Sequence, residues 1–108
     1  MSRQLIFFPA VSRDYAEGYV YYENLSPGFG GARFEVAFRD AITSVEVGLT
    51  THYRCFGNFH RVLLPRFPYS LYYRMHMETV VVVALLYSRY DPKKIQTILA
   101  ARAADPQP

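Results

Sequence analysis

The chain has 108 residues, of which 51% are hydrophobic and 19% are charged, with a formal net charge of +3. This length and apolar content indicate one folded domain and exclude both a disordered chain and a two-domain enzyme with its own nucleotide-binding fold. The longest uncharged apolar run, residues 80–87, is far shorter than the roughly 18 residues of a membrane-spanning helix. We therefore predict a single domain over residues 1–108, with residues 103–108 as a frayed tail and no membrane partner.

Cysteine content and the N-terminus indicate the cellular compartment. The single cysteine, Cys55, excludes an internal disulfide and a secreted disulfide scaffold. A basic residue, Arg3, lies near the start of the chain, but the apolar stretch that follows spans only residues 5–8, whereas a secretory signal needs about 7–15 apolar residues. We expect a cytoplasmic protein.

The positive charge is concentrated in the second half of the chain. Residues 1–50 carry four basic and six acidic side chains, whereas residues 51–102 carry eight basic and two acidic ones. Such a basic half is suited to binding a nucleic acid or an acidic protein partner. A solvated basic surface without a partner is the alternative reading of the same pattern.

A strand and a helix are predicted first. Residues 4–8 read as a short strand that Pro9 ends. Asp14 followed by Glu17 has the spacing of a capping box, which predicts that a helix begins there. Apolar or aromatic residues then recur at helical spacing, at Tyr15, Gly18, Tyr19, Tyr22 and Leu25.

A second helix follows a Pro/Gly-rich break. Residues 26–31 hold one proline and three glycines and predict a turn between the helices. Gly48 is suited to the left-handed position that ends a helix. The two helices would form an antiparallel hairpin. One apolar face of the second helix is formed by Phe34, Ala37, Phe38, Ala41, Ile42 and Val45.

The hydrophobic period then changes to that of strands. Residues 60–64 form a candidate strand that ends at Pro65. In residues 69–76, apolar Leu71, Tyr73 and Met75 alternate with more polar positions, which predicts one apolar and one charged face. A two-residue turn, Met77 and Glu78, leads into residues 79–87, whose unbroken β-branched run is typical of a central strand covered on both faces.

The chain closes with a short helix, because Asp91 followed by Pro92 is typical of an N-cap and first helical position. The predicted fold class is α+β: an N-terminal strand, an α-helical hairpin, a three-stranded antiparallel meander and a short C-terminal helix.

Three groups of residues together resemble RelE/ParE-type toxins of bacterial type II toxin–antitoxin systems. The strings at residues 21–23, 26–30 and 33–35 resemble the helical hairpin of that family, residues 66–73 its Phe-Pro-Tyr strand hairpin, and residues 81–92 its last strand and turn. The resemblance spans roughly residues 5–102 and is closer to the ParE-like branch of the family.

The resemblance implies the same compact α+β fold and one of two activities. One branch of the family poisons DNA gyrase, and the other cleaves mRNA in the ribosome. We predict a growth-inhibiting, plasmid-stabilising toxin that acts on DNA gyrase. The alternatives are a ribosome-dependent mRNA endonuclease and an inactive antitoxin-binding module. Poisoning gyrase requires only a binding surface, so in that case the chain is not an enzyme.

Candidate site residues follow from the chemistry of each activity. RNA cleavage without a metal needs a base, cations that stabilise the phosphorane, and an acid. Ser70 and Leu63 stand where the resemblance would place basic residues. The residues available for a nuclease are His60, Arg61, Arg66, Arg89 and Tyr90. The predicted contacts to a target or an antitoxin are Arg61, Arg66, Tyr72, Arg74, Arg89 and Tyr90.

The partners implied by the resemblance are a cognate antitoxin, forming a hetero-oligomer, and either gyrase or the ribosome with mRNA. The helical hairpin and the strand edge at residues 4–8 are candidate surfaces for an acidic, amphipathic antitoxin segment. We predict no cofactor and no metal, since His52 and Cys55 lack the second ligand pair that zinc sites show. Tyrosines of the first helix are either core residues or stacking platforms for unpaired bases.

Overall fold

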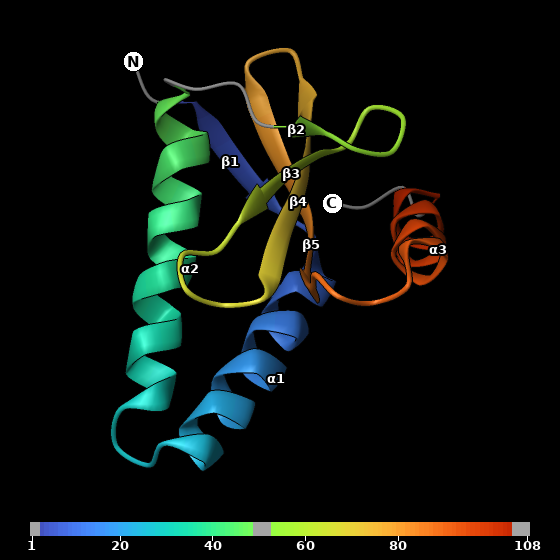
Figure 1. The fold of residues 1–108 in the computed structure, drawn as a ribbon. Helices are drawn as coiled ribbons and strands as arrows, with labels where there is room; N and C mark the ends of the chain where they lie inside the picture. Colours follow the sequence, from blue (N-terminus) through green and yellow to red (C-terminus); the bar gives the residue numbers. More distant parts are fainter. Residues whose placement is uncertain (1–2, 49–52, 105–108) are drawn as a thin grey trace.

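The structure is a computed structural model that describes residues 3–48 and 53–104. One helical hairpin packs on one side of a sheet, and a third helix lies on the other side (Figure 1). In chain order the elements are β1 (Gln4–Phe7), α1 (Pro9–Leu25), α2 (Gly30–Val47), β2 (Tyr53–Arg54), β3 (His60–Leu63), β4 (Tyr69–His76), β5 (Thr79–Tyr87) and α3 (Pro92–Ala103). The predicted α+β class and element order are confirmed.

The strands form one sheet in the order β1-β5-β4-β3-β2. The predicted meander is confirmed, since β3, β4 and β5 pair antiparallel. The N-terminal strand β1 pairs parallel with β5, so that Leu5 lies opposite Val80 and Phe7 opposite Val82. The two-residue strand β2 was not predicted, because two residues are too few to show an alternating pattern.

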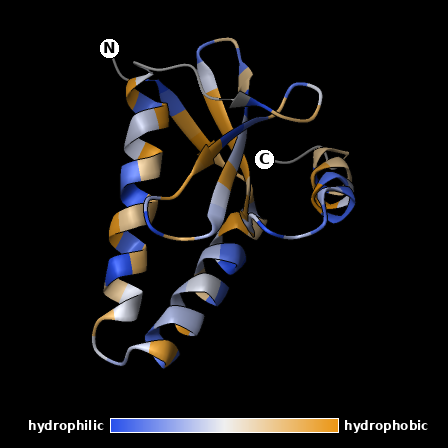
Figure 2. Cartoon of the chain, in the orientation of Figure 1, coloured by the Kyte–Doolittle hydropathy of each residue, from blue (hydrophilic) through white to orange (hydrophobic). Residues whose placement is uncertain are grey.

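Strand β4 corrects the prediction of one apolar and one charged face. Leu71, Tyr72 and Tyr73 are consecutive and all are buried. Helices cover both faces of the central strands, and a register shift between Tyr72 and Tyr73 interrupts the simple alternation. The central strand β5 is buried over residues 80–86, as the β-branched run predicts. Figure 2 shows this central part of the sheet largely in the hydrophobic colour.

Aromatic rings fill the space between the helical hairpin and the sheet. Phe34 of α2 is fully buried and lies 5.5 Å from Tyr22 of α1 and 5.2 Å from Tyr69 of β4, measured between ring centroids. Tyr15 of α1 lies 4.8 Å from Phe38 of α2. The predicted helical stripes therefore face each other, except that Leu25 at the end of α1 is 62% exposed.

The predicted capping box at Asp14 is wrong. Helix α1 begins at Pro9, directly after β1, and its N-cap residue Phe8 makes no side-chain cap bond. Proline suits this first position because its missing N–H needs no partner there. Asp14 lies one turn further on and is buried, so its carboxylate serves a tertiary contact instead of a cap.

The tertiary contact of Asp14 provides hydrogen-bond partners for backbone groups of β5 that lie beyond the end of β1. Asp14 Oδ2 accepts a hydrogen bond of 3.0 Å from the backbone N–H of Leu85, and Arg102 Nη1 donates one of 3.0 Å to the carbonyl of Val83. Arg102 Nη1 also lies 2.6 Å from Asp14 Oδ2. One ion pair therefore joins α1, α3 and the edge of β5, and it satisfies backbone groups that no strand pairs.

The turn between α1 and α2 is held by Glu23. Its carboxylate accepts hydrogen bonds from the backbone N–H groups of Gly28 and Gly31, at 2.6 and 3.0 Å. These bonds lower the pKa of Glu23. Helix α2 begins at Gly30, which corrects the prediction that the break extends through residues 30–31. Its end at Gly48, with a φ of 69°, is confirmed.

Replacing Gly30 by alanine is expected to destabilise the fold by about 1–3 kcal/mol, the usual cost of inserting atoms into a packed site. A Cβ at this position would lie 1.8 Å from the backbone carbonyl oxygen of Tyr22, so the hairpin turn would have to open. Urea unfolding measures the change. Gly57→Ala is the control because it makes the same chemical change without a clash. A Cβ at this position meets nothing within 4 Å, and only the positive φ of Gly57 opposes the substitution. Equal losses for both variants would refute the clash at Gly30.

Helix α3 begins as predicted. Asp91 is its N-cap, and its Oδ1 accepts a hydrogen bond of 2.9 Å from the backbone N–H of Lys93. Ile95 and Leu99 are buried against the sheet. Residues 105–108 of the predicted tail lie outside the described residues, whereas α3 runs to Ala103. Among the described residues, no helix has the length and apolar character needed to span a bilayer.

Candidate functional site

Four tyrosines gather where α1, the start of β4 and the end of β5 meet. We name Tyr22, Tyr69, Tyr87 and Tyr90 the tyrosine cluster. Ring centroids are 6.0 Å apart between Tyr22 and Tyr69, 6.0 Å between Tyr69 and Tyr87, and 5.5 Å between Tyr87 and Tyr90. Each of these pairs meets edge to face, which is a favourable arrangement for aromatic rings.

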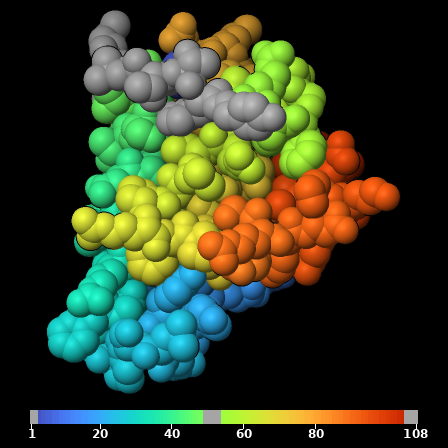
Figure 3. Space-filling model, in the orientation of Figure 1, coloured from blue at the N-terminus to red at the C-terminus, as the bar shows by residue number. Residues whose placement is uncertain are grey.

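Two loops frame the tyrosine cluster. The backbone N–H of Ser88, after β5, donates a hydrogen bond of 2.8 Å to the carbonyl of Pro68, before β4. Phe67 of the same β3–β4 loop lies 4.6 Å from Tyr22, between ring centroids. Figure 3 shows this loop, in yellow, beside the connection from β5 to α3, in orange, with α1 in blue beneath both.

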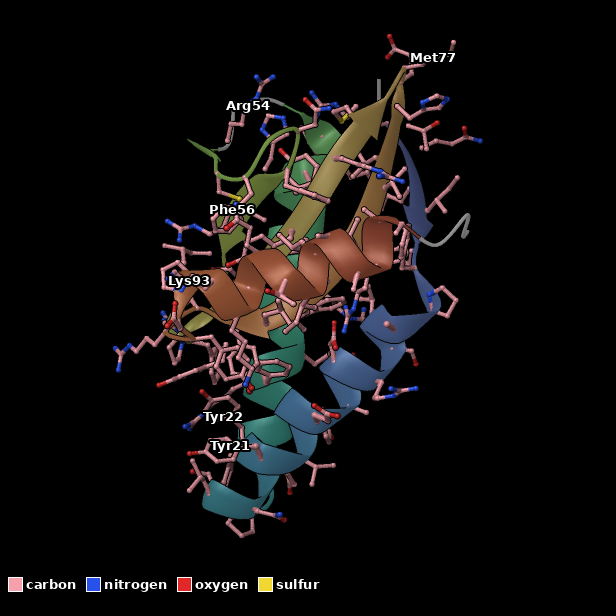
Figure 4. All side chains as sticks on the ribbon, turned by 90° about the vertical axis from the view of Figure 1, so that its right-hand side faces the viewer. Tyr21, Tyr22, Arg54, Phe56, Met77 and Lys93 are labelled. Carbon is pink, nitrogen blue, oxygen red and sulfur yellow. The ribbon has the colours of Figure 1, made fainter. Side chains whose placement is uncertain are left out.

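Cations lie at the rim of the tyrosine cluster. Lys94 Nζ is 3.8 Å from the ring centroid of Tyr90, a cation–π contact. Burial, followed by the nearby Tyr21 and Tyr87 hydroxyls, raises the pKa of Tyr22, and the Arg89 guanidinium opposes this effect. Arg89, Lys93 and Lys94 are exposed. Figure 4 shows Tyr21, Tyr22 and Lys93 on the same side of the molecule.

Tyr69 lies at the centre of the cluster. Burial, followed by the neighbouring Tyr22, Tyr90 and Tyr21 hydroxyls and by Glu17, raises the pKa of Tyr69 to about 12. At neutral pH this hydroxyl is a hydrogen-bond donor that does not readily release its proton. The site therefore offers aromatic surface and positive charge, without an activated acid or base on Tyr69.

We expect the folded protein to lose stability as the pH rises from about 10, the ordinary pKa of tyrosine, towards about 12, the pKa of Tyr69 in the fold. In this range the unfolded chain releases the Tyr69 proton while the folded chain keeps it, so the stabilisation present below pH 10 is lost. Urea unfolding at several alkaline pH values measures the slope. Tyr69→Phe should flatten it, and an unchanged slope in that variant would assign the effect to other tyrosines.

The predicted residues Arg66, Arg89 and Tyr90 lie in the two loops that frame the cluster. Arg66 is exposed, has a left-handed φ of 68°, and lies at a groove of about 870 Å³ between α2 and the β3–β4 loop. Arg33 and Val36 of α2 also line this groove. Tyr90 is 37% exposed. The groove and the tyrosine cluster meet at Phe67.

The predicted residues His60 and Arg61 lie elsewhere on the sheet. Arg61 is opposite Tyr72 and His60 is opposite Tyr73, with a stacked ring contact of 5.2 Å between His60 and Tyr73. These partners are three and four positions along β4 from Tyr69, which corresponds to about 10–14 Å at ~3.4 Å per residue. Consecutive strand residues also face opposite sides of a sheet. The fold thus separates this pair from Arg89 and Tyr90.

Three further sequence positions are also accounted for. Tyr72, a predicted contact residue, is only 1% exposed, so its ring lies inside the fold and not on a docking surface. Ser70 is fully buried as well. Arg74 is near the other end of β4, opposite Val81, with its guanidinium carbon 5.8 Å from the ring centroid of Phe8. It therefore lies apart from the tyrosine cluster.

Sequence reasoning did not assign Tyr69 or Lys94 to a site, and it left Tyr22 open between a core residue and a stacking platform. Tyr22 belongs to the helical aromatic stripe and Tyr69 to the Phe-Pro-Tyr string, so both carried a signal that also fits a core. Only the tertiary contacts join them to Tyr90.

The predicted absence of a metal site rests partly on His52, which lies outside the described residues. Cys55 Sγ lies 3.7 Å from the carbonyl oxygen of Phe59, and burial raises the pKa of this thiol. Its thiol form is therefore favoured over the nucleophilic thiolate. Residues 3–48 and 53–104 contain no group of three or more His, Cys, Asp or Glu side chains arranged to hold a metal ion.

Comparison with known proteins supports the fold. No protein-family model matches the chain, and no curated protein matches it. Among solved structures, a chain of the chromosomal ParDE TA system from P. aeruginosa is similar, with a TM-score of 0.58 and 16% sequence identity. The match covers 77% of this chain and 92% of that chain. The two chains share one fold. At this identity the likeness concerns the fold alone, and it agrees with the predicted RelE/ParE-like class.

Proposed function

We propose that this protein is the toxin of a type II toxin–antitoxin pair and inhibits growth by binding DNA gyrase. The fold it shares with a chain of a ParDE TA system supports a toxin role. The three sequence strings that resemble RelE/ParE-type toxins fall on α1, α2, β4 and β5, which are the elements that surround the tyrosine cluster.

The observation that favours binding over RNA cleavage is the separation of the candidate catalytic residues. A metal-free nuclease requires its base, acid and phosphate-binding cations around one reacting phosphate. His60 and Arg61 pair with Tyr73 and Tyr72, whereas Arg89 and Tyr90 follow the strand end that pairs with Tyr69. The position that would carry a further cation, Ser70, is fully buried. A gyrase poison needs none of these groups.

The groove beside α2 is the proposed binding site of the antitoxin. Arg33 and Val36 of α2 line one wall of the groove and Arg66 of the β3–β4 loop lines the other, and Val36 is 59% exposed. An acidic, amphipathic segment that folds on binding would pair with both arginines and cover the valine. Asp40 also lines the groove and would repel acidic side chains of the segment. Those side chains would therefore lie beside Arg33 and Arg66.

The test is a gyrase assay with antitoxin-free protein, supercoiled plasmid and ATP, resolved on a gel. We expect linear DNA to accumulate, because a poison traps the cleaved complex. A parallel translation reaction with a reporter mRNA measures ribosome-dependent cleavage. Protein that stops growth, leaves gyrase unaffected and cuts the mRNA would overturn the proposal and establish the nuclease alternative. Protein that binds an antitoxin but does not stop growth would establish an inactive binding module.

A further inference from the structure

The tyrosine cluster continues along α1 and ends in two exposed rings. Tyr21 lies 5.0 Å from Tyr22, between ring centroids, and is 56% exposed. Tyr90, at the other end of the row, is 37% exposed. Each neighbouring pair from Tyr21 to Tyr90 meets edge to face. The chain therefore presents a row of aromatic rings whose two end members are open to solvent.

The hydroxyls of this row lie close to one another. Burial, and after it the nearby hydroxyls of Tyr22, Tyr90 and Tyr21, raises the pKa of Tyr69 to about 12, so this hydroxyl keeps its proton at neutral pH. Within residues 3–48 and 53–104, the hydroxyls of the tyrosine cluster make no hydrogen bond to the protein. Neighbouring O–H donors without a protein acceptor are suited to an oxygen-rich anion such as a phosphate, with which they form strong hydrogen bonds.

Three cations adjoin the same row. Arg89, Lys93 and Lys94 are exposed, and neither ion pair of the described residues includes them. Lys94 Nζ lies over the ring of Tyr90, and Arg89 is near enough to Tyr22 to act on its hydroxyl electrostatically. The positive charge beside the aromatic row is therefore available to an anion from outside the chain.

Carboxylates do not cancel this charge. Asp91 Oδ1 accepts a hydrogen bond from the backbone N–H of Lys93, and the Glu23 carboxylate accepts two from the hairpin turn. Burial has the largest effect on the pKa of Tyr69 and the Glu17 carboxylate the smallest, so this acid adds little negative charge to the site. A phosphate that approaches the row meets a positive surface.

The combination of rings and cations favours an unpaired nucleic-acid strand over an acidic protein segment. Every base has a flat face that stacks on a tyrosine ring, and each phosphate pairs with a lysine or arginine. A segment rich in carboxylates would use the cations and leave the exposed rings of Tyr21 and Tyr90 without partners. In a duplex the bases stack on one another, so they offer no face to these rings.

We propose that the tyrosine cluster and the cations at its rim bind a single strand of DNA. Bases stack on the exposed rings of Tyr21 and Tyr90, and the hydroxyls and cations hold the phosphates. The choice of DNA over RNA rests on the proposed function, because a gyrase poison acts on a complex that holds cleaved DNA. The proposal goes beyond that function, since it places a contact on the nucleic acid itself.

Fluorescence anisotropy with the antitoxin-free chain and a labelled oligothymidine tests the proposal without gyrase. The strand has about 12 nucleotides, within the ~4–16 that single-strand sites cover. We expect it to bind at least about tenfold more tightly than a duplex of the same length, because only the single strand can stack on the rings. If the three cations neutralise three phosphates, binding should weaken roughly twentyfold between about 50 and 200 mM salt.

Two variants separate stacking from charge. Tyr90→Ala should weaken binding by about 5–150-fold, the loss of one stacked base, with an unchanged salt dependence. Lys93→Gln/Lys94→Gln should reduce the salt dependence to about that of one phosphate. Phe29→Ala is the matched control and should bind as the wild type does. Phe29 is a 62% exposed ring outside the tyrosine cluster, and it has its own cation, Arg33, 5.6 Å from its centroid.

Three results would overturn the proposal. They are a duplex bound as tightly as the single strand, an RNA strand or an acidic peptide of the same length bound more tightly than the DNA, and a folded Tyr90→Ala that binds no more weakly than Phe29→Ala. The first two comparisons use the unaltered chain, so they decide the proposal even where a variant does not fold. Protein that traps cleaved DNA in the gyrase assay but binds no oligothymidine overturns this proposal alone and leaves the proposed function standing.

Discussion

Replacing Arg102 by alanine is expected to lower the free energy of unfolding by about 3–5 kcal/mol, the range for breaking a buried ion pair by removing one partner. The Asp14 side chain is 8% exposed and that of Arg102 is 21% exposed, so water screens the pair little. Among the described residues, the substitution leaves the buried Asp14 carboxylate with the Leu85 N–H as its remaining donor. It also leaves the Val83 carbonyl without the Arg102 donor.

The size of this effect follows from where β1 ends. The last residue of β1, Phe7, lies opposite Val82, so no strand in the described part of the chain neighbours the next residues of β5 on that side. Asp14 and Arg102 supply the acceptor and the donor that a longer β1 would have supplied. The same pair attaches α3 to α1, so the loss should spread to the packing of Leu99, which is 1% exposed.

Urea unfolding of Arg102→Ala and of Arg39→Ala provides the comparison. Arg39 forms an exposed pair with Glu35 at i,i+4 spacing, with a shortest distance of 2.7 Å. Such helix pairs contribute about 0.2–0.5 kcal/mol. A loss for Arg102→Ala as small as that for Arg39→Ala would show that the Asp14–Arg102 pair contributes little to stability and that water satisfies the edge of β5.

Reversing the charge of Arg66 and Arg89 together is expected to reduce growth inhibition strongly while leaving the fold intact. Both side chains are exposed, and they belong to the two loops joined by the Ser88–Pro68 hydrogen bond. Electrostatic steering by a charged surface changes the association rate with an oppositely charged partner by about 10–10³-fold, so reversing both charges should lower that rate within this range. The expectation rests on the prediction from sequence that Arg66 and Arg89 contact the target.

Growth after induction and the yield of linear plasmid in the gyrase assay measure the effect. Arg13→Glu is the matched control, because Arg13 is an exposed arginine on α1 that belongs to neither loop. Arg61 is less suitable for reversal, since it is half-buried and its charge acts on the buried hydroxyl of Tyr72. Full toxicity in a folded Arg66→Glu/Arg89→Glu variant would exclude these loops from the active surface.

Local patterns were sufficient to predict most elements. The β-branched run of β5, the Asp91–Pro92 start of α3 and the Gly48 end of α2 each have a physical cause within a few residues. A predicted helix boundary was wrong where the same residue type can serve either as a helix cap or as a tertiary contact. Asp14 has the spacing of a cap, yet its carboxylate bonds to Leu85, which is distant in sequence.

The predicted site residues likewise include some that the fold places in adjoining loops and one that it buries. Arg66, Arg89 and Tyr90 were predicted from strings that resemble a family, and they lie in adjoining loops. Tyr72 was predicted as a contact residue because it alternates with apolar neighbours, but both faces of β4 are covered and its ring is buried. Whether a strand is covered on its second face depends on the other elements of the fold and not on its own residues.

The sequence by itself determined the α+β class, the order of the elements and the concentration of positive charge in the second half, because these depend on local propensity, hydrophobic period and composition. Only the tertiary structure decided three other features. These are the parallel placement of β1 at the edge of β5, the use of Asp14 and Arg102 where β1 ends, and the separation of His60 and Arg61 from Arg89 and Tyr90. Each of them depends on contacts between residues far apart in the chain, which no local pattern records.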